Sequence, residues 1–447
     1  METAVEMADL VQEFVDSLAS LPPAASEEDN IDRLQHLERA KRALAAAQAS
    51  ATNAFVEQRK AHEAGMRITT SEQLKGIEAE VGLARGESPF VGAALTYTAT
   101  ALCNVLPNTY AALADGRMSE YHARIVAEQT SHLSDAHRRE IDGLIAHRVG
   151  KASSSQLRKL IQGHAYRLDR KAAEQRAAQN QRDRRVCLDP GSDGISYLTA
   201  ELPTHQAVAV MDALQQQTNK RLAAQRRDAA NTPDDLDNSD AEQPLTRDQV
   251  MADLFVELLT GQTTADGVTA EVVVVMHDSS LFGDDDVPAW IPGHGPLPAG
   301  MVKHWLADPQ AAKFFRRMYT RATDGQLVAL ESKRRHFPEG LSKMLAIRDD
   351  TCATPWCNSP VEDADHRKPW AKGGTTSWAN ATGLCKRCNQ RKENRGWSYT
   401  GTPDRLTVTT PTGHQYTVPT RPPISQIRHT TTDPPIGPID IAWPAAA

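Results

Sequence analysis

The chain has 447 residues, the length of two to four domains of about 150 residues each. Apolar residues make up 40% of it and charged residues 24%, a balance that excludes wholesale disorder. The net charge of -7 argues against a protein that coats nucleic acid or an anionic membrane along its whole length.

The composition also indicates where the protein works. No stretch approaches the roughly 18 consecutive apolar residues that a membrane span needs, so we expect no membrane partner. The first residues are acidic and do not fit a secretory signal, which begins with basic residues. We therefore expect a cytoplasmic protein whose six cysteines are reduced and form no disulfides.

The first part of the chain has helical patterns. Residues 1–32 mix acidic and small residues with two prolines, and we expect a flexible lead-in. Residues 33–63 contain no glycine or proline, which predicts a long helix. Further amphipathic segments, one of them starting with a capping box at residues 70–73, predict a helical domain over residues 33–190. Its N-terminal helices could join two copies in a homodimer.

The pattern changes in residues 191–330, which predict a small α+β continuation of the helical domain. Apolar and polar residues alternate over 195–202, as in a half-buried strand, and the β-branched run at 272–276 predicts a buried strand. Helices are expected from Thr204 onward and over 247–260.

Other segments predict loops. Residues 228–246 are acidic without apolar rhythm, and residues 283–300 are rich in Gly, Asp and Pro. At the end of the chain, residues 401–447 predict a hairpin, built from 406–409 and 415–418, and then a Pro-rich tail.

Four of the six cysteines lie within 37 residues, as the pairs Cys352-x4-Cys357 and Cys385-x2-Cys388. Two short pairs of thiolates suit a tetrahedral structural zinc, because each pair sits on one tight knuckle and the metal joins the knuckles. The alternative is four buried cysteines without a metal, which the paired spacing in a reducing compartment disfavours.

Other polar residues lie within and beside this cluster. Asp365 and His366 are adjacent, Asn380 precedes the second pair, and Asn389 directly follows it. A zinc site made of four cysteines needs none of these groups. A carboxylate beside an imidazole, with a carboxamide next to a rigid knuckle, could hold a divalent cation and activate a water.

Residues 340–398 resemble an HNH endonuclease domain of the zinc-stabilised type. The resemblance is carried by the following residues in order: Cys352, Cys357, Asp365-His366, Pro369-Trp370, Gly373-Gly374, Asn380, Leu384-Cys385, Cys388-Asn389 and Lys392. It implies a ββα-metal fold, in which a hairpin carries the histidine and a helix closes the site, within a domain at residues 331–400.

The resemblance also implies a role for each polar residue. His366 would be the general base that deprotonates a water for attack on phosphorus. Asp365 and Asn389 would hold one Mg²⁺ or Mn²⁺ ion, and Asn380 would brace the loop and orient the histidine. The chain departs from the family pattern at Arg367, where a β-branched apolar residue is usual, and at Asn389, where histidine is commoner.

Basic residues surround this predicted site, and we expect them to contact the phosphates of DNA. They are Arg367, Lys368, Lys372, Lys386, Arg387, Arg391 and Lys392. Residues 331–400 hold 13 Lys and Arg against 8 Asp and Glu, a net charge of +5, so the remainder carries -12. The alternative is a merely solvated basic face.

The whole chain resembles actinobacterial proteins in which a helical domain of unknown function 222 (DUF222) precedes an HNH segment, the mycobacterial thirteen-E-twelve repeat proteins. Short motifs carry this likeness, at residues 193–203, 293–298 and 348–352. The function predicted is a metal-dependent DNA endonuclease. The alternatives are a catalytically inactive zinc-stabilised DNA-binding module and an interaction protein of a mobile-element family.

Overall fold

The computed structural model describes residues 2–148, 150–192, 194–231, 245–264, 273–307, 331–332, 335–403 and 405–419. The chain divides into two compact units. The first comprises Met1–Arg85 and Pro89–Ala177, and the second comprises Gly86–Ser88 and Ala178–Ala447. Each unit is described by itself.

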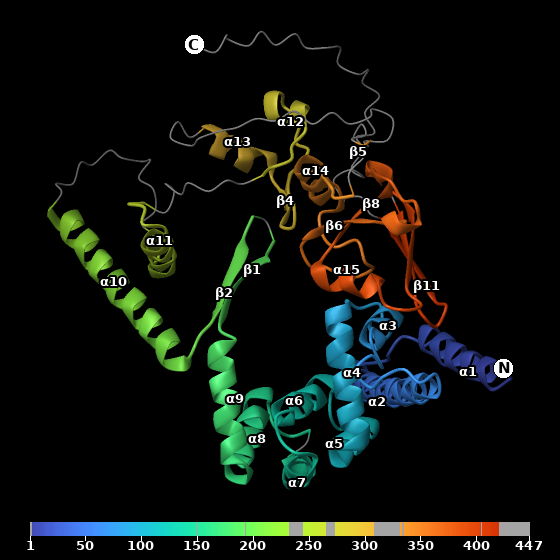
Figure 1. The fold of residues 1–447 in the computed structure, drawn as a ribbon. Helices are drawn as coiled ribbons and strands as arrows, with labels where there is room; N and C mark the ends of the chain where they lie inside the picture. Colours follow the sequence, from blue (N-terminus) through green and yellow to red (C-terminus); the bar gives the residue numbers. More distant parts are fainter. Residues whose placement is uncertain are drawn as a thin grey trace. The chain divides into compact units, whose positions relative to one another are not determined.

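The first unit is helical, as predicted, and runs from blue to green in Figure 1. Its helices are α1 (Glu2–Ala19), α2 (Glu27–Gly65), α3 (Ile77–Ala84), α4 (Pro89–Asn104), α5 (Pro107–Ala114), α6 (Glu120–Thr130), α7 (Asp135–Ile145), α8 (Ser154–Leu168) and α9 (Arg170–Arg182), which continues into the second unit after Ala177. The apolar faces of α2 and of α4 to α8 meet in one core that includes Leu102, Leu113, Ile125, Ile141 and Ile161, whereas the apolar side chains of α1 from Leu10 to Leu18 are exposed. Removing these faces from water stabilises the bundle.

Serine caps set where several of these helices begin. The hydroxyls of Ser26, Ser119, Ser134 and Ser153 each accept a hydrogen bond from a backbone N–H in the first turn of α2, α6, α7 and α8. Such caps are each worth about 1 kcal/mol. The side chain of Gln156 completes a capping box at Ser153.

Two sequence predictions for the first unit are wrong. The expected flexible lead-in over 1–32 contains α1 and the first turn of α2, since apolar residues repeat at helical spacing in α1 and Ser26 caps α2. The capping box at 70–73 does not open a helix. These residues form turns, and the Glu63 carboxylate accepts the N–H of Leu74 at 2.7 Å, so that α3 starts at Ile77.

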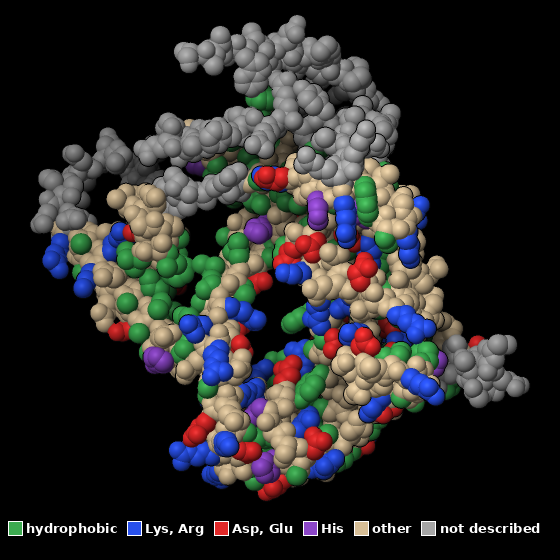
Figure 2. Space-filling model, viewed as in Figure 1, with side chains coloured by type: hydrophobic (Ala, Val, Ile, Leu, Met, Phe, Trp, Pro, Cys, Tyr) green, Lys and Arg blue, Asp and Glu red, His purple; other side chains and the backbone are tan. Residues whose placement is uncertain are grey.

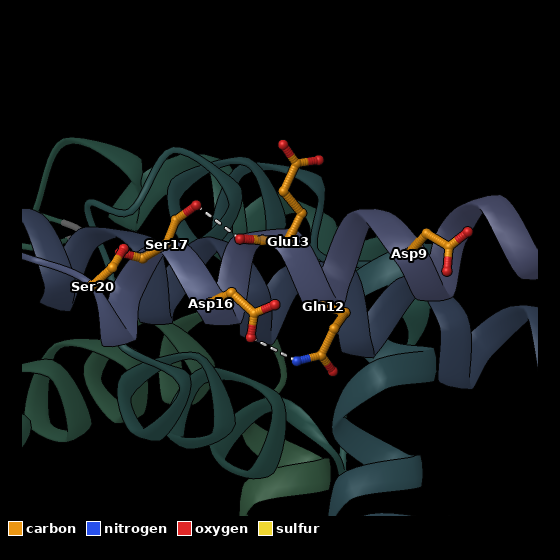
Figure 3. Close-up of a pocket in the computed structure, with 6 residues that line it drawn as sticks. All are labelled: Asp9, Gln12, Glu13, Asp16, Ser17 and Ser20. Atoms are coloured by element: carbon orange, nitrogen blue, oxygen red, sulfur yellow. Dashed lines mark hydrogen bonds between the residues drawn. The ribbon is translucent and has the colours of Figure 1, made fainter.

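The polar side of α1 lines a shallow hollow, shown in Figure 3. Its side chains bond along their own helix. The amide of Gln12 donates to Asp16 at 2.8 Å, and the hydroxyl of Ser17 donates to the carbonyl of Glu13 at 2.8 Å. These groups do not converge on one point, so the hollow gives no candidate site.

The second unit begins with the hairpin of β1 (Arg185–Pro190) and β2 (Ser196–Glu201), followed by α10 (Thr204–Asn231) and α11 (Arg247–Thr260). The starts of both helices agree with the sequence prediction. The strand at 195–202 was expected to be half-buried, but every residue of β2 is exposed. Figure 2 shows further hydrophobic side chains on the surface around α10 and α11, where Val208 and Leu259 are exposed.

The structure differs from the sequence prediction at the two expected loops and at the strand expected over residues 272–276. Residues 228–231 belong to α10, and 232–244 lie outside the described residues. The expected loop at 283–300 contains the hairpin of β3 (Ala289–Ile291) and β4 (Gly295–Leu297) and the start of α13 (Ala299–Ala307). The strand expected at 272–276 is reduced to one bridge, in which Val275 pairs with Trp290. A short helix, α12 (Asp278–Phe282), follows it.

The second unit continues with a small α+β domain. It contains β5 (Glu331–Ser332), α14 (Glu339–Asp349), β6 (Asp363–His366), β7 (Thr376–Ser377), β8 (Ala381–Leu384) and α15 (Lys386–Lys392). Strands β6 and β8 pair antiparallel, with His366 opposite Ala381, and α15 packs against β6 (Figure 1). This is the expected order of a hairpin with the histidine and a closing helix.

Three antiparallel strands follow, β9 (Ser398–Thr402), β10 (Arg405–Thr409) and β11 (Gln415–Pro419). The hairpin predicted from 406–409 and 415–418 is confirmed, and β9 is an additional strand. The predicted tail falls mostly in residues 420–447, outside the described part of the chain. Among the described residues no single helix is long and apolar enough to cross a membrane.

A buried ion pair joins α14 to β8. The guanidinium of Arg348 donates to both carboxylate oxygens of Asp349 at 2.6 and 2.8 Å and to the carbonyl of Ala381 at 2.9 Å. Asp349 in turn accepts the N–H of Gly383 at 2.6 Å. Both side chains are buried, and their remaining polar atoms have partners, which is the condition under which a buried pair is tolerated.

Candidate metal centre and active site

The four clustered cysteines lie together on two knuckles. In the first, the N–H of Cys357 donates to the carbonyl of Thr354 at 3.0 Å. In the second, Cys385 caps α15 and its sulfur accepts the N–H of Cys388 at 3.5 Å. All four are buried, and their sulfur atoms lie within 4.8 Å of one another.

The geometry of this cluster fits a structural zinc. The Sγ of Cys357 is 3.9 Å from that of Cys385 and 3.8 Å from that of Cys388. A tetrahedral zinc with bonds of about 2.3 Å would separate its sulfur ligands by ~3.8 Å. Hydrogen bonding among the four thiols shifts their pKa values in opposite directions: it lowers the pKa of Cys357, to about 7, and of Cys385, and it raises the pKa of Cys352 and of Cys388.

His366 ends β6 and is buried, at 8% exposure. Its Nε2 lies 2.8 Å from the hydroxyl of Thr376, and the rings of Phe337 and Trp370 lie 4.6 and 5.9 Å from it between centroids. Burial lowers the pKa of the imidazole below its usual value, and the positive charge of Lys392 acts in the same direction against the carboxylate of Asp365. The imidazole is therefore neutral at pH 7.

Asn380 fastens the loop that follows His366. Its Oδ1 accepts the N–H of Lys368 at 2.8 Å, and its Nδ2 donates to the carbonyls of Lys368 at 3.0 Å and Thr375 at 2.8 Å. Position 374 in this loop requires glycine, because a Cβ on Gly374 would lie 1.8 Å from the carbonyl oxygen of Lys368. The side chain of Asn380 thus closes the loop with both its oxygen and its nitrogen.

Asp365 and Asn389 have partners on the neighbouring elements. The ammonium of Lys392 contacts the carboxylate of Asp365 and the carbonyl of His366. The Nδ2 of Asn389 donates to the carboxylate of Asp363 at 3.0 Å, which leaves its Oδ1 as the end free to serve as a ligand. Carboxylate and carboxamide oxygens are the hard donors that Mg²⁺ and Mn²⁺ prefer, so the donor set fits such an ion.

Comparison with protein-family models gives two matches. Residues 31–349 match the domain of unknown function DUF222, and residues 354–395 match the HNH endonuclease domain. The first match covers more than half of the chain. The chain belongs to the DUF222 family. Comparisons with curated proteins and with solved structures give no match.

Both resemblances inferred from the sequence are therefore confirmed, and the HNH domain stands at the C-terminal end of this DUF222 protein. The residues of the DUF222 motif at 348–350 hold the two parts of the second unit together. The Oδ1 of Asp350 accepts the indole N–H of Trp290 and the backbone N–H of Gly293, both at 2.7 Å. Asp350 lies between the two family matches, so the boundary between DUF222 and the HNH domain is itself hydrogen-bonded to the β3–β4 hairpin.

The seven basic residues expected at phosphates divide into two groups. The exposed ones are Lys368, Lys372, Lys386 and Arg387. The other three are buried within the domain. Arg367 donates to the carbonyl of Ala379 at 3.0 Å, Arg391 donates to the sulfur of Cys388 at 3.7 Å, and Lys392 contacts Asp365. Phosphate contact stays a prediction for all seven, and the burial of these three leaves the four exposed residues as its candidates at the surface.

Several residues of the site were missed in the sequence. Thr376 and Phe337 contact His366, and Asp363 holds Asn389. Asp363 could have been found, because residues two apart on a strand share one face and Asp365 was already a candidate. Thr376 and Phe337 carry no comparable signal, since their contacts with His366 depend on how segments far apart in the sequence pack together.

Proposed function

We propose that this DUF222 protein is a metal-dependent endonuclease that hydrolyses phosphodiester bonds of DNA, with His366 as the general base. The observation that carries the proposal is a neutral, buried imidazole beside the carboxylate of Asp365, on a strand backed by the helix that the four cysteines fix. The match to the HNH endonuclease family over 354–395 supports the reaction type.

His366 has the properties that a base at neutral pH requires. Its pKa lies below the ordinary value of about 6.5, so at pH 7 the ring accepts a proton. A water that gives its proton to the imidazole would attack phosphorus in line with the leaving O3′. Asn380 would support this step from a distance, by closing the loop next to the histidine.

The oxygens of Asp365 and Asn389 would hold one Mg²⁺ or Mn²⁺ ion. Such an ion, when bound, supplies positive charge to the non-bridging and leaving oxygens of the phosphodiester. Asp363 would keep the amide of Asn389 with Oδ1 toward the ion. The exposed Lys368, Lys372, Lys386 and Arg387 would contact phosphates on either side of the scissile bond.

A second candidate rests on the contact between Lys392 and Asp365. The ammonium already compensates the carboxylate that would bind the catalytic ion. A domain that keeps this pair closed would be a zinc-stabilised DNA-binding module without turnover.

A nicking assay separates the two candidates. The full chain is incubated with supercoiled plasmid, with and without added Mg²⁺ or Mn²⁺, and DNA binding is measured in parallel by mobility shift. Metal is omitted and not chelated, because a chelator would also remove the zinc. The proposal expects nicking only with added metal, whereas binding without nicking under all conditions supports the second candidate.

A further inference from the structure

His366 is held through one ring nitrogen by a buried hydroxyl. The Nε2 lies 2.8 Å from the Oγ1 of Thr376, a residue with 0% exposure on β7. That same oxygen lies 3.2 Å from the backbone carbonyl of Arg335. The imidazole, the hydroxyl and the carbonyl thus form a short chain.

The proton positions in this chain follow from counting donors. A hydroxyl has one hydrogen, and a carbonyl oxygen can only accept. The hydroxyl of Thr376 therefore donates to Arg335 and accepts the proton on Nε2. This assigns the Nε2–H tautomer to neutral His366 and leaves the lone pair on Nδ1, for which no hydrogen-bond partner is found within the described ranges.

Two aromatic rings also lie close to the imidazole. Phe337 lies 4.6 Å from it and Trp370 lies 5.9 Å from it, between ring centroids. Phe337 is fixed in turn by packing on Leu341 and Trp378, which form a small core under α14. The ring therefore has little freedom to rotate away from Thr376.

Two of the residues that make these contacts belong to the DUF222 region, which precedes the HNH segment. Arg335 and Phe337 lie within 31–349, whereas the HNH match starts at residue 354. The pairing of β5 with β7 brings the two segments together, with Ser332 opposite Thr376. The end of the DUF222 region thus contributes directly to the surroundings of the HNH histidine.

We infer that Thr376 and the DUF222 segment Arg335–Phe337 are positioning residues, which fix His366 in the Nε2–H tautomer so that Nδ1 is the basic nitrogen. The inference rests on the proposed nuclease function. It adds that the HNH site is completed by the C-terminal end of the DUF222 region, which makes the two parts one catalytic unit.

The first test compares Thr376→Val with Thr376→Ser in the full chain. Valine keeps the shape of threonine and removes the hydroxyl, whereas serine keeps the hydroxyl. Thr376→Val should slow plasmid nicking on the order of 10-fold to 100-fold, while Thr376→Ser restores most of the wild-type rate. Both variants are first shown to retain zinc, and a Thr376→Val rate equal to wild type overturns the inference.

The second test reads the tautomer without using activity. Histidines are labelled with nitrogen-15, spectra are recorded at pH 8, and the signals of His366 are assigned by their loss in His366→Gln. The wild type should show the proton on Nε2, and Thr376→Val should show a mixture of tautomers. A proton on Nδ1 in the wild type contradicts the assignment.

The third test addresses the DUF222 segment through Phe337→Leu, which keeps an apolar side chain in the small core and removes the ring from the imidazole. Nicking should slow several-fold with unchanged zinc content, and an unchanged rate removes Phe337 from the inference. A wild-type chain that does not nick overturns the proposed function itself. The nitrogen-15 spectrum tests the hydrogen bond between His366 and Thr376 whether or not the chain nicks DNA.

Discussion

The two groups of polar residues in the C-terminal domain are built on opposite principles. The zinc cluster consists of four like side chains that converge on one point, with sulfur atoms within 4.8 Å of one another. At the edge formed by β6 and α15, unlike side chains each have a different partner, such as Lys392 for Asp365 and Asp363 for Asn389. We expect the cluster to stabilise the fold of the domain, whereas under the proposed function the edge would exchange its partners for metal and substrate.

This difference predicts which changes destroy the domain and which only alter its chemistry. Zinc supplies folding energy to a small domain, so losing one ligand removes much of its stability. At the edge, a substitution leaves the zinc cluster in place and changes the rate, the metal dependence or the binding of DNA.

The largest effect is expected for Cys385→Ser, which removes the sulfur that also caps α15. The variant should lose its zinc and the cooperative unfolding of residues 335–419, measured by metal analysis and limited proteolysis. Cys103→Ser is the control, since this thiol lies in the first unit outside the cluster. Full zinc content in Cys385→Ser would refute the assigned ligand set.

Breaking the buried ion pair should come next. Asp349→Ala leaves the guanidinium of Arg348 buried without its carboxylate and frees the N–H of Gly383. Removal of one partner of a buried pair costs about 3–5 kcal/mol, measured as the free energy of unfolding of the C-terminal domain. The exposed pair Lys343–Glu339 is the control, where Lys343→Ala should change that free energy by no more than about 0.5 kcal/mol.

The pH dependence of nicking tests the neutral imidazole. The pKa of His366 is lowered by its burial, so the base is unprotonated above that pKa and protonated below it. The rate should be flat through pH 7 to 8 and fall about tenfold per pH unit in acid, with the midpoint below the ordinary ~6.5. A rate that keeps rising above pH 7 would contradict a lowered pKa.

Lys392→Met should have a smaller effect with a defined direction. It removes the ammonium from Asp365 and leaves a side chain of similar length. Half-saturation of nicking by Mn²⁺ should move several-fold toward lower metal concentration, because a carboxylate without a neighbouring cation attracts the ion more strongly. Lys386→Met, at an exposed position, should leave this midpoint unchanged.

The smallest effect is expected for the exposed basic residues. Lys386→Gln should weaken DNA binding several-fold. The plot of the logarithm of the binding constant against the logarithm of the salt concentration should become less steep by about 1, the value for one lost phosphate contact. Lys41→Gln, on the first unit, is the control. An unchanged salt slope in Lys386→Gln would remove this residue from the DNA contact.

The sequence predicts those features of the second unit that depend only on neighbouring residues, such as metal-ligand spacing and helix caps. The cysteine pairs indicate zinc by type and spacing alone, and α11 starts at Arg247 because Thr246 and Gln249 form a capping box before an apolar repeat. The segment at 70–73 has the same kind of pattern but forms turns, since the carboxylate of Glu63 holds Leu74 in a left-handed conformation.

The candidate site could be predicted only in part, for a physical reason. Asp365, His366 and Asn389 are residue types that bind metal or take up protons, so the sequence points to them. The partners of these side chains depend on strand pairing and helix packing, which no local pattern encodes. Lys392 looks like a phosphate contact in the sequence, yet packing of α15 on β6 turns it onto Asp365.

The most direct test of the central claim is the single-turnover rate of plasmid nicking with Mn²⁺ in His366→Ala, measured beside His414→Ala. His414 is an exposed histidine directly before β11 in the same unit and has no place in the proposed mechanism. His366→Ala should lose at least about 100-fold in rate while it keeps its zinc, and His414→Ala should match the wild type. Equal rates in wild type and His366→Ala would contradict the assignment of His366 as the general base.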